Sequence, residues 1–206
     1  MYYYNTISVI FRPEKKSLDE IITFFSGQFI DRCDHVRRNS EQLETKMKQE
    51  TSRFVIFKHL DPLMYKSATS KRLELKVLSF ADLQAVMPAF EKDNPEVIFL
   101  GTEKTEVESN CDWFTLNITS DEDAVKVLDL AIQDKAEFHR AFPGMLRLNE
   151  MQSSIAAQSR GLLAWHQSHQ FCSQCGSKSD MSEGGYKRTC ANEACKTRQG
   201  NIERIL

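Results

Sequence analysis

Four cysteines near the C-terminal end of the sequence constrain its fold more than any other feature. Their spacing is C-x2-C-x14-C-x4-C, formed by Cys172, Cys175, Cys190 and Cys195. Two intervening residues let one short turn place two thiolates on the same side of a metal ion, and zinc ligand pairs are typically separated by two to four residues. We therefore expect these cysteines to hold one structural Zn²⁺. Four thiolates leave no open position for a catalytic water.

The segment around these cysteines has few side chains with which to build a core. Its large apolar residues are Phe171, Met181 and Tyr186. Segments shorter than about 40 residues usually need a metal, disulfides or a partner to fold, and a structural zinc supplies about 10–16 kcal/mol. Gly184-Gly185 suits a hairpin tip between the two cysteine pairs. The sequence thus favours a zinc ribbon, and the alternative is a set of free or oxidised thiols.

Charge and the chain ends indicate a protein without a membrane or a strong nucleic-acid partner. The chain has 27 basic and 29 acidic side chains, a net charge of −2. A tetrathiolate zinc carries −2, which cancels the basic excess of residues 169–200. We see neither a secretory signal nor an apolar run long enough to span a bilayer. The expected compartment is the cytoplasm, where thiols stay reduced; Cys33 and Cys111 are then expected to be buried apolar residues rather than nucleophiles.

Residues 1–148 mix the patterns of strands and helices. Apolar runs and alternation predict strands at 53–58, 73–78, 97–101 and 113–118. Helical spacing predicts helices at 17–30, at 80–90 as far as Pro88, and at 120–140, while 34–52 is an exposed helix or a connector. Asp61-Pro62 predicts a turn. The interpretation is an α+β domain with a mixed or antiparallel sheet.

A helix over residues 149–168 is expected to connect this domain to the ribbon. Asn149, followed by Gln152, approximates a capping box at its start. The predicted organisation is therefore a domain at 1–148, a connecting helix at 149–168, a zinc ribbon at 169–200 and a short tail at 201–206.

Several motifs resemble one known family. Residues 162–166, 171–176 and 183–190, which read LLAWH, FCSQCG and EGGYKRTC, resemble the NADH pyrophosphatase branch of the Nudix hydrolases. They are most similar to its animal peroxisomal type, which is also described as a hydrolase of NAD-capped RNA. Upstream segments are more loosely similar to the same branch, at 31–32, 52–54, 60–63, 97–101 and 113–114. The resemblance covers about residues 30–200.

The resemblance implies a function that depends on a third part. Family members join a non-catalytic N-terminal domain and a zinc ribbon to a Nudix domain, which splits NADH into NMNH and AMP. That domain holds Mg²⁺ or Mn²⁺ on a helix with the pattern G-x5-E-x7-R-E-x2-E-E-x-G. The glutamates at 41–44 and 103–108 do not form this pattern, and 201–206 does not resemble the family. The prediction is a truncated product with no catalytic residues.

Partners and compartment are likewise implied by the resemblance. The N-terminal domain and ribbon of family members take part in homodimer assembly, so a homodimer or a pair with a full-length subunit is expected. A non-catalytic interaction module is the alternative function. NAD(H) would bind only where the catalytic domain is supplied. The family also implies a peroxisomal location, although the final residues Arg204-Ile205-Leu206 are not a peroxisomal targeting tripeptide.

Overall fold

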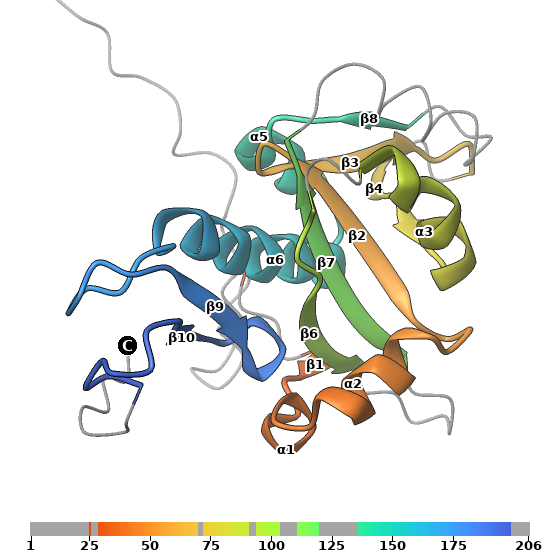
Figure 1. Ribbon diagram of the computed structural model, residues 1–206. Coiled ribbons are helices and arrows are strands. Elements are labelled where there is room, and N and C mark those ends of the chain that lie inside the picture. The colour runs from red at the N-terminus through yellow and green to blue at the C-terminus, as the bar shows by residue number, and fades with distance from the viewer. Residues whose placement is uncertain are drawn as a thin grey trace, which may run out of the picture.

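A mixed sheet forms the centre of the molecule, seen in a computed structural model (Figure 1). The structure describes residues 25, 29–69, 72–90, 94–103, 111–119 and 136–198. Within them the sheet follows the order β1-β6-β7-β2-β3-β4, with β5 on β2 and β8 on β3. The strands are β1 (Ile30–Asp31), β2 (Arg53–Lys58), β3 (Asp61–Lys66), β4 (Leu73–Leu75), β5 (Val77–Leu78), β6 (Ile98–Glu103), β7 (Asp112–Ile118) and β8 (Ala136–Phe138). This confirms the predicted α+β class.

The two central strands, β2 and β7, pair in parallel, and the other strand pairs of this sheet are antiparallel. Their register runs from Arg53 beside Trp113 to Lys58 beside Ile118. The middle four residues of β2 are fully buried, because both faces of the strand are covered. A continuous apolar run is typical of such a strand, which explains why the sequence identified it.

Helices cover both faces of the sheet. The helices are α1 (Asp34–Arg37), α2 (Ser40–Met47), α3 (Phe80–Val86), α5 (Ala141–Met145) and α6 (Glu150–Ser168). The core on one face contains Phe54 and Ile56 of β2 together with Leu83 of α3. The core on the opposite face contains Val55 of β2 and Ile155 of α6. Residues 34–52 contain two short helices rather than only a connector; α2 has no buried residue, as expected for an exposed helix, whereas Val36 of α1 is buried in the core.

Three local predictions are corrected by the structure. The turn expected at Asp61-Pro62 lies instead at His59 and Leu60, whose φ values of 51° and 67° fit a two-residue hairpin loop. The side-chain oxygen of Asn117 accepts a hydrogen bond from the Leu60 amide at 2.9 Å, which fixes this loop. The strand expected at 73–78 is two strands, because the chain leaves β3 for β2 at Lys76.

The third correction concerns the helix predicted at 120–140. Residues 136–138 form β8, since their backbone pairs with Leu63–Tyr65 on β3. The rest of that prediction up to residue 135, most of the helix predicted at 17–30, and the tail at 201–206 lie outside the described residues. Pro88 was expected to end a helix, and the chain there tightens into a 3-10 turn, η2 (Met87–Phe90).

The α6 helix begins as predicted and also contributes to the core. Asn149 caps it, since its side chain accepts a hydrogen bond from the Gln152 amide at 2.9 Å. Ala156 and Leu163 are buried against the sheet, so the helix does more than connect two parts. No helix in the described part of the chain is long and apolar enough to cross a membrane.

A buried ion pair joins α2 to the sheet. Asp112 on β7 is 1 % exposed, and its carboxylate accepts hydrogen bonds from Lys46 Nζ at 3.0 and 2.9 Å. The Thr102 hydroxyl donates to the same carboxylate at 2.5 Å. Loss of either partner would leave a buried charge unpaired, which strongly destabilises a protein. The pair therefore holds α2 against the end of the sheet.

Candidate metal centre

The cysteines lie in a C-terminal segment built around a small antiparallel hairpin. Its strands are β9 (Ser179–Ser182) and β10 (Lys187–Cys190), joined by the 3-10 turn η3 (Glu183–Gly185). Gly184 and Gly185 have φ values of 63° and 98°, which glycine adopts without steric cost. The glycine pair therefore forms the hairpin tip, as the sequence predicted.

This hairpin tip packs tightly against the sheet. A Cβ atom on Gly185 would lie 2.5 Å from Ile98 Cγ2 on β6, and one on Gly184 would lie 3.3 Å from Leu43 Cδ1 on α2. No side chain larger than hydrogen fits at Gly185 without displacing Ile98. The hairpin and the N-terminal part of the protein thus share a packed interface.

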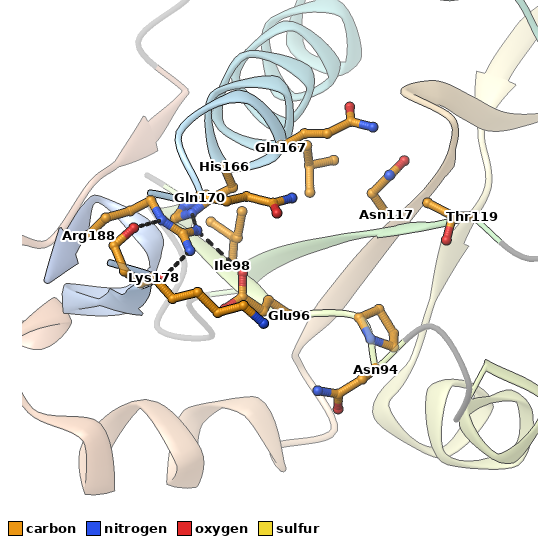
Figure 2. Close-up of a pocket in the computed structure, with 13 residues that line it drawn as sticks. Asn94, Glu96, Ile98, Asn117, Thr119, His166, Gln167, Gln170, Lys178 and Arg188 are labelled. Atoms are coloured by element: carbon orange, nitrogen blue, oxygen red, sulfur yellow. Dashed lines mark hydrogen bonds and ion pairs between the residues drawn. The ribbon is translucent and has the colours of Figure 1, made fainter. Parts of the chain in front are cut away.

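Hydrogen bonds of His166 and Arg188 join α6 to the hairpin, and Figure 2 shows the one between these two side chains. His166 is buried, and its Nε2 lies 2.7 Å from the carbonyl oxygen of Gly185. Since a carbonyl only accepts, Nε2 carries the proton and Nδ1 accepts from the Arg188 guanidinium at 2.7 Å. Burial lowers the pKa of His166 below its ordinary 6.5. The imidazole is therefore held neutral.

Tyr186 makes a second link to the sheet. Its hydroxyl donates to the Leu100 carbonyl oxygen at 2.8 Å. The side-chain amide of Gln158 donates to the Tyr186 hydroxyl oxygen at 2.6 Å and to the Leu100 carbonyl oxygen at 2.8 Å. The Arg37 guanidinium lies 3.9 Å from the centre of the Tyr186 ring. Burial raises the pKa of Tyr186, so its hydroxyl keeps the proton that it donates.

The first cysteine pair lies on a tight turn. The Gly176 amide donates to the Cys172 carbonyl at 2.8 Å, and the Cys172 amide donates to the Ser177 carbonyl at 2.7 Å. Gly176 has a φ of 72°, which closes the turn. Cys172 and Cys175 are thereby presented on one side of the loop.

The second cysteine pair is separated by a longer turn. Cys190 ends β10, and Asn192 then organises the loop: its side-chain oxygen accepts from the Ala194 amide at 3.0 Å and its carbonyl accepts from the Cys195 amide at 3.1 Å. Four intervening residues are accommodated because this asparagine turns the chain back. Cys190 and Cys195 are both buried.

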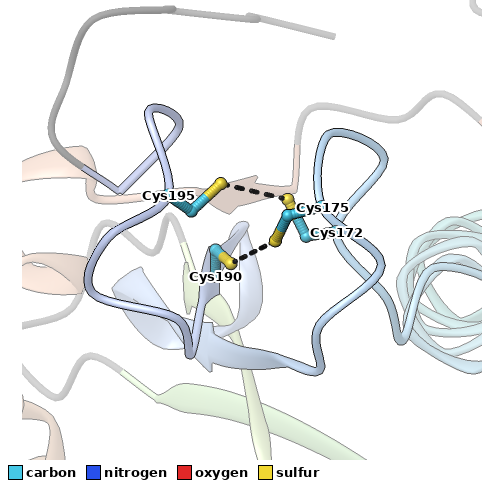
Figure 3. A group of neighbouring side chains, drawn as sticks. All are labelled: Cys172, Cys175, Cys190 and Cys195. Carbon is cyan, nitrogen blue, oxygen red and sulfur yellow. Dashed lines mark hydrogen bonds between the residues drawn. The ribbon is translucent and has the colours of Figure 1, made fainter.

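The four sulfur atoms converge, as Figure 3 shows. All lie within 4.8 Å of one another, with 3.8 Å between Cys172 and Cys195 and 3.5 Å between Cys175 and Cys190. A tetrahedron with Zn–S bonds of about 2.3 Å has sulfur–sulfur edges of about 3.8 Å. A disulfide would need about 2.05 Å. The donor set and its spacing therefore fit a structural zinc.

The thiols differ in how readily they lose their protons. Hydrogen bonding from the Thr197 hydroxyl lowers the pKa of Cys172 to about 6. The Ser177 hydroxyl lowers the pKa of Cys175, whereas burial raises the pKa of Cys190 to about 12. Zinc binds thiolates and displaces the remaining protons, so Cys172 and Cys175 are prepared for the metal, whereas Cys190 needs the metal to lose its proton.

The remaining candidates from the sequence stay apart from this cluster. Cys33 and Cys111 are half-buried rather than buried as expected, and Cys33 Sγ contacts Thr102 Oγ1 at 3.5 Å. Within the described part of the chain, the four ribbon cysteines are the one group of three or more potential ligands close enough to hold a metal. Sequence reasoning missed Tyr186, His166 and Arg188 as links, because only their partners across the interface reveal their role.

Two family models match the chain in succession. The NADH pyrophosphatase-like rudimentary NUDIX domain matches residues 51–165, and the NADH pyrophosphatase zinc ribbon domain matches residues 167–200. The chain belongs to the NADH pyrophosphatase-like NUDIX family. Its ribbon is the segment that holds the four cysteines, and strands β2 to β8 with residues 150–165 of α6 lie in its NUDIX-like part.

Curated relatives agree with this family. The human "NAD-capped RNA hydrolase NUDT12" is 29 % identical over 203 residues, covering 89 % of this chain and 43 % of that protein. The mouse "NAD(P)H pyrophosphatase NUDT13, mitochondrial" is 28 % identical, covering 69 % of this chain and 41 % of that protein. The "NAD-capped RNA hydrolase" of Schizosaccharomyces pombe is 25 % identical, with coverages of 82 % and 49 %. The chain spans less than half the length of these relatives.

Proposed function

We propose that these residues form the N-terminal and zinc-ribbon part of an NAD(H) diphosphatase, which hydrolyses NADH to NMNH and AMP and removes NAD caps from RNA. The succession of the two family domains over residues 51–165 and 167–200 carries this proposal. The tight contact of Gly185 with Ile98 supports it, because a ribbon fixed on the sheet can hold a following domain in a defined position.

We propose further that the 206 residues alone do not hydrolyse NADH. Pyrophosphate cleavage in this family needs Mg²⁺ or Mn²⁺ on clustered carboxylates, which neutralise phosphate charge and activate water. The sequence contains no glutamate-rich Nudix pattern, and the described residues offer no carboxylate cluster of that kind. The residues present therefore do not fit the catalytic ion, and NAD(H) is expected to bind only where a catalytic domain is supplied.

The test of this proposal is a hydrolysis assay on the purified chain. Incubation with NADH or NAD-capped RNA and Mn²⁺ should release no AMP and no uncapped RNA, with the human relative as the active control. Release of AMP at the rate of that control would contradict the proposal. Fusing the chain to the C-terminal part of the human relative should give an active, zinc-containing enzyme, whereas an inactive fusion that folds would count against the family assignment of function.

The alternative is a non-catalytic interaction module that pairs with itself or with a full-length hydrolase. Three large apolar side chains favour it, because they are exposed and a partner could cover them. Their exposed fractions are 67 % for Phe142, 46 % for Leu146 and 61 % for Phe171. Light scattering after size exclusion measures the mass. A dimer that Phe142→Ser dissociates would support the module, whereas a monomer that does not bind a full-length family member would exclude it.

We infer a cytoplasmic location. Fluorescence microscopy of the tagged chain at its natural level of expression tests this, and signal confined to peroxisomes would favour the location implied by the family instead.

A further inference from the structure

A polar cleft lies where the ribbon, the end of α6 and the sheet meet (Figure 2). Its volume is about 540 Å³, within the range of about 300–1,000 Å³ usual for small-molecule sites. Ile98 and Leu163, which are both buried, contribute apolar surface to its lining. Most of its other lining residues are polar, among them Glu96, Asn117, Gln170, Lys178 and Arg188. The metal cluster is not part of this lining.

The residues that line the cleft carry a net charge of +1, counted without the metal cluster, which lies outside this lining. Arg188, with a side chain 11 % exposed, donates to the Ser179 hydroxyl at 2.9 Å and lies 3.6 Å from the Glu96 carboxylate. Exposed Lys178 makes no ion pair with the described residues. His166 is neutral, since its Nδ1 accepts from Arg188. Because Arg188 is paired with Glu96, Lys178 is the cation of the lining that is left to attract an anion.

Side-chain amides supply the other polar groups of the cleft. Those of Asn94, Gln167 and Gln170 form no hydrogen bond with any described residue. Asn117 uses its oxygen on the Leu60 amide, which leaves its NH₂ group for another acceptor. None of the residues lining the cleft is aromatic apart from the His166 ring, whose two nitrogens are engaged. The cleft therefore offers hydrogen bonds to hydroxyl groups but no ring on which a base would stack.

We propose that this cleft binds a phosphorylated sugar, with Lys178 on the phosphate and the carboxamides of Gln170 and Asn117 on the sugar hydroxyls. Lys178 is free to move toward a phosphate, and Arg188 is held in place by Ser179 and His166. The shared chemistry is a phosphate beside sugar hydroxyls, which a free sugar phosphate and an RNA strand both present. The site goes beyond the proposed hydrolase function and does not depend on it.

Binding to the intact, zinc-loaded chain tests the proposal. Titration calorimetry with ribose 5-phosphate should give saturable binding, while ribose and inorganic phosphate each bind at least roughly tenfold more weakly, because each lacks half of the contacts. AMP should bind about as tightly as ribose 5-phosphate, because the cleft has no stacking surface for adenine. Equal binding of inorganic phosphate, or no binding of ribose 5-phosphate, would overturn the proposal.

Matched lysine variants locate the site. Lys178→Gln should weaken ribose 5-phosphate roughly tenfold, the loss expected for one charge-assisted hydrogen bond. Lys187→Gln on the same hairpin is the control, since Lys187 pairs with Glu183 outside the cleft, and it should bind like the wild type. Equal weakening by both variants would refute the site. A short oligoribonucleotide that competes with ribose 5-phosphate would identify RNA as the source, and one that does not compete would identify the free sugar phosphate.

Discussion

Substituting Gly185 by alanine should disrupt the contact between the ribbon and the sheet. The added Cβ would lie 2.5, 3.0 and 3.1 Å from Cγ2, Cγ1 and Cβ of Ile98, and the φ of 98° is one that alanine rarely adopts. Overpacking of this kind costs about 1–3 kcal/mol, and the backbone conformation adds about 1–2 kcal/mol. The expected loss of about 2–5 kcal/mol is large against a typical unfolding free energy of about 5–15 kcal/mol.

Two other glycines separate these causes in urea denaturation followed by circular dichroism. Gly176 has a φ of 72° with nothing within 4 Å of the added Cβ, so Gly176→Ala should lose only the backbone cost of about 1–2 kcal/mol. Gly161 lies within α6 with open space around it, so Gly161→Ala should gain about 0.5–1 kcal/mol. If Gly185→Ala were no less stable than Gly176→Ala, the argument for a packed interface would be refuted.

Three further predictions concern protonation, metal and charge. The wild type should lose stability as the pH falls below 6.5, by up to about 1.4 kcal/mol per pH unit, because folding lowers the pKa of His166 and so favours its neutral form. Denaturation curves at several pH values measure this loss, and His166→Gln should lack this component of it. Parallel pH profiles of wild type and variant would contradict the prediction. Cys172→Ser, or removal of zinc by a chelator, should abolish amide-exchange protection in 171–198 and leave it intact in β2 and β7, as measured by mass spectrometry. Loss of protection in both regions would show that the sheet needs the metal. Lys46→Met should cost about 3 kcal/mol by leaving buried Asp112 unpaired, and adding Asp112→Asn should recover much of this in a double-mutant cycle; additive losses would exclude the coupling.

The metal centre could be predicted from sequence because its signal is local. The spacing of Cys172, Cys175, Cys190 and Cys195 contains most of the geometry, and two short turns complete it. The apolar run of β2 was equally readable, since a strand buried on both faces needs no alternation. Such features depend on neighbours in the sequence, and a single sequence displays them directly.

Other features depend on contacts between distant segments. The turn lies at His59 and Leu60 rather than at Asp61-Pro62, because Asn117 on β7 holds Leu60. The strand at 136–138 arises from pairing with β3, which no local pattern encodes. The cleft likewise joins residues from 94 to 188. Its amides and lysine look like ordinary surface residues until the fold brings them together.

The parallel pairing of β2 with β7 sets an order for folding during synthesis. Residues 53–58 emerge from the ribosome first, yet the backbone groups on one of their edges have no neighbour until residues 113–118 have been made. Pairing between such distant segments is slow, and an unpaired apolar strand edge in a nascent chain is prone to aggregate. A chaperone that shields β2 until translation passes residue 118 would therefore increase the yield of native protein.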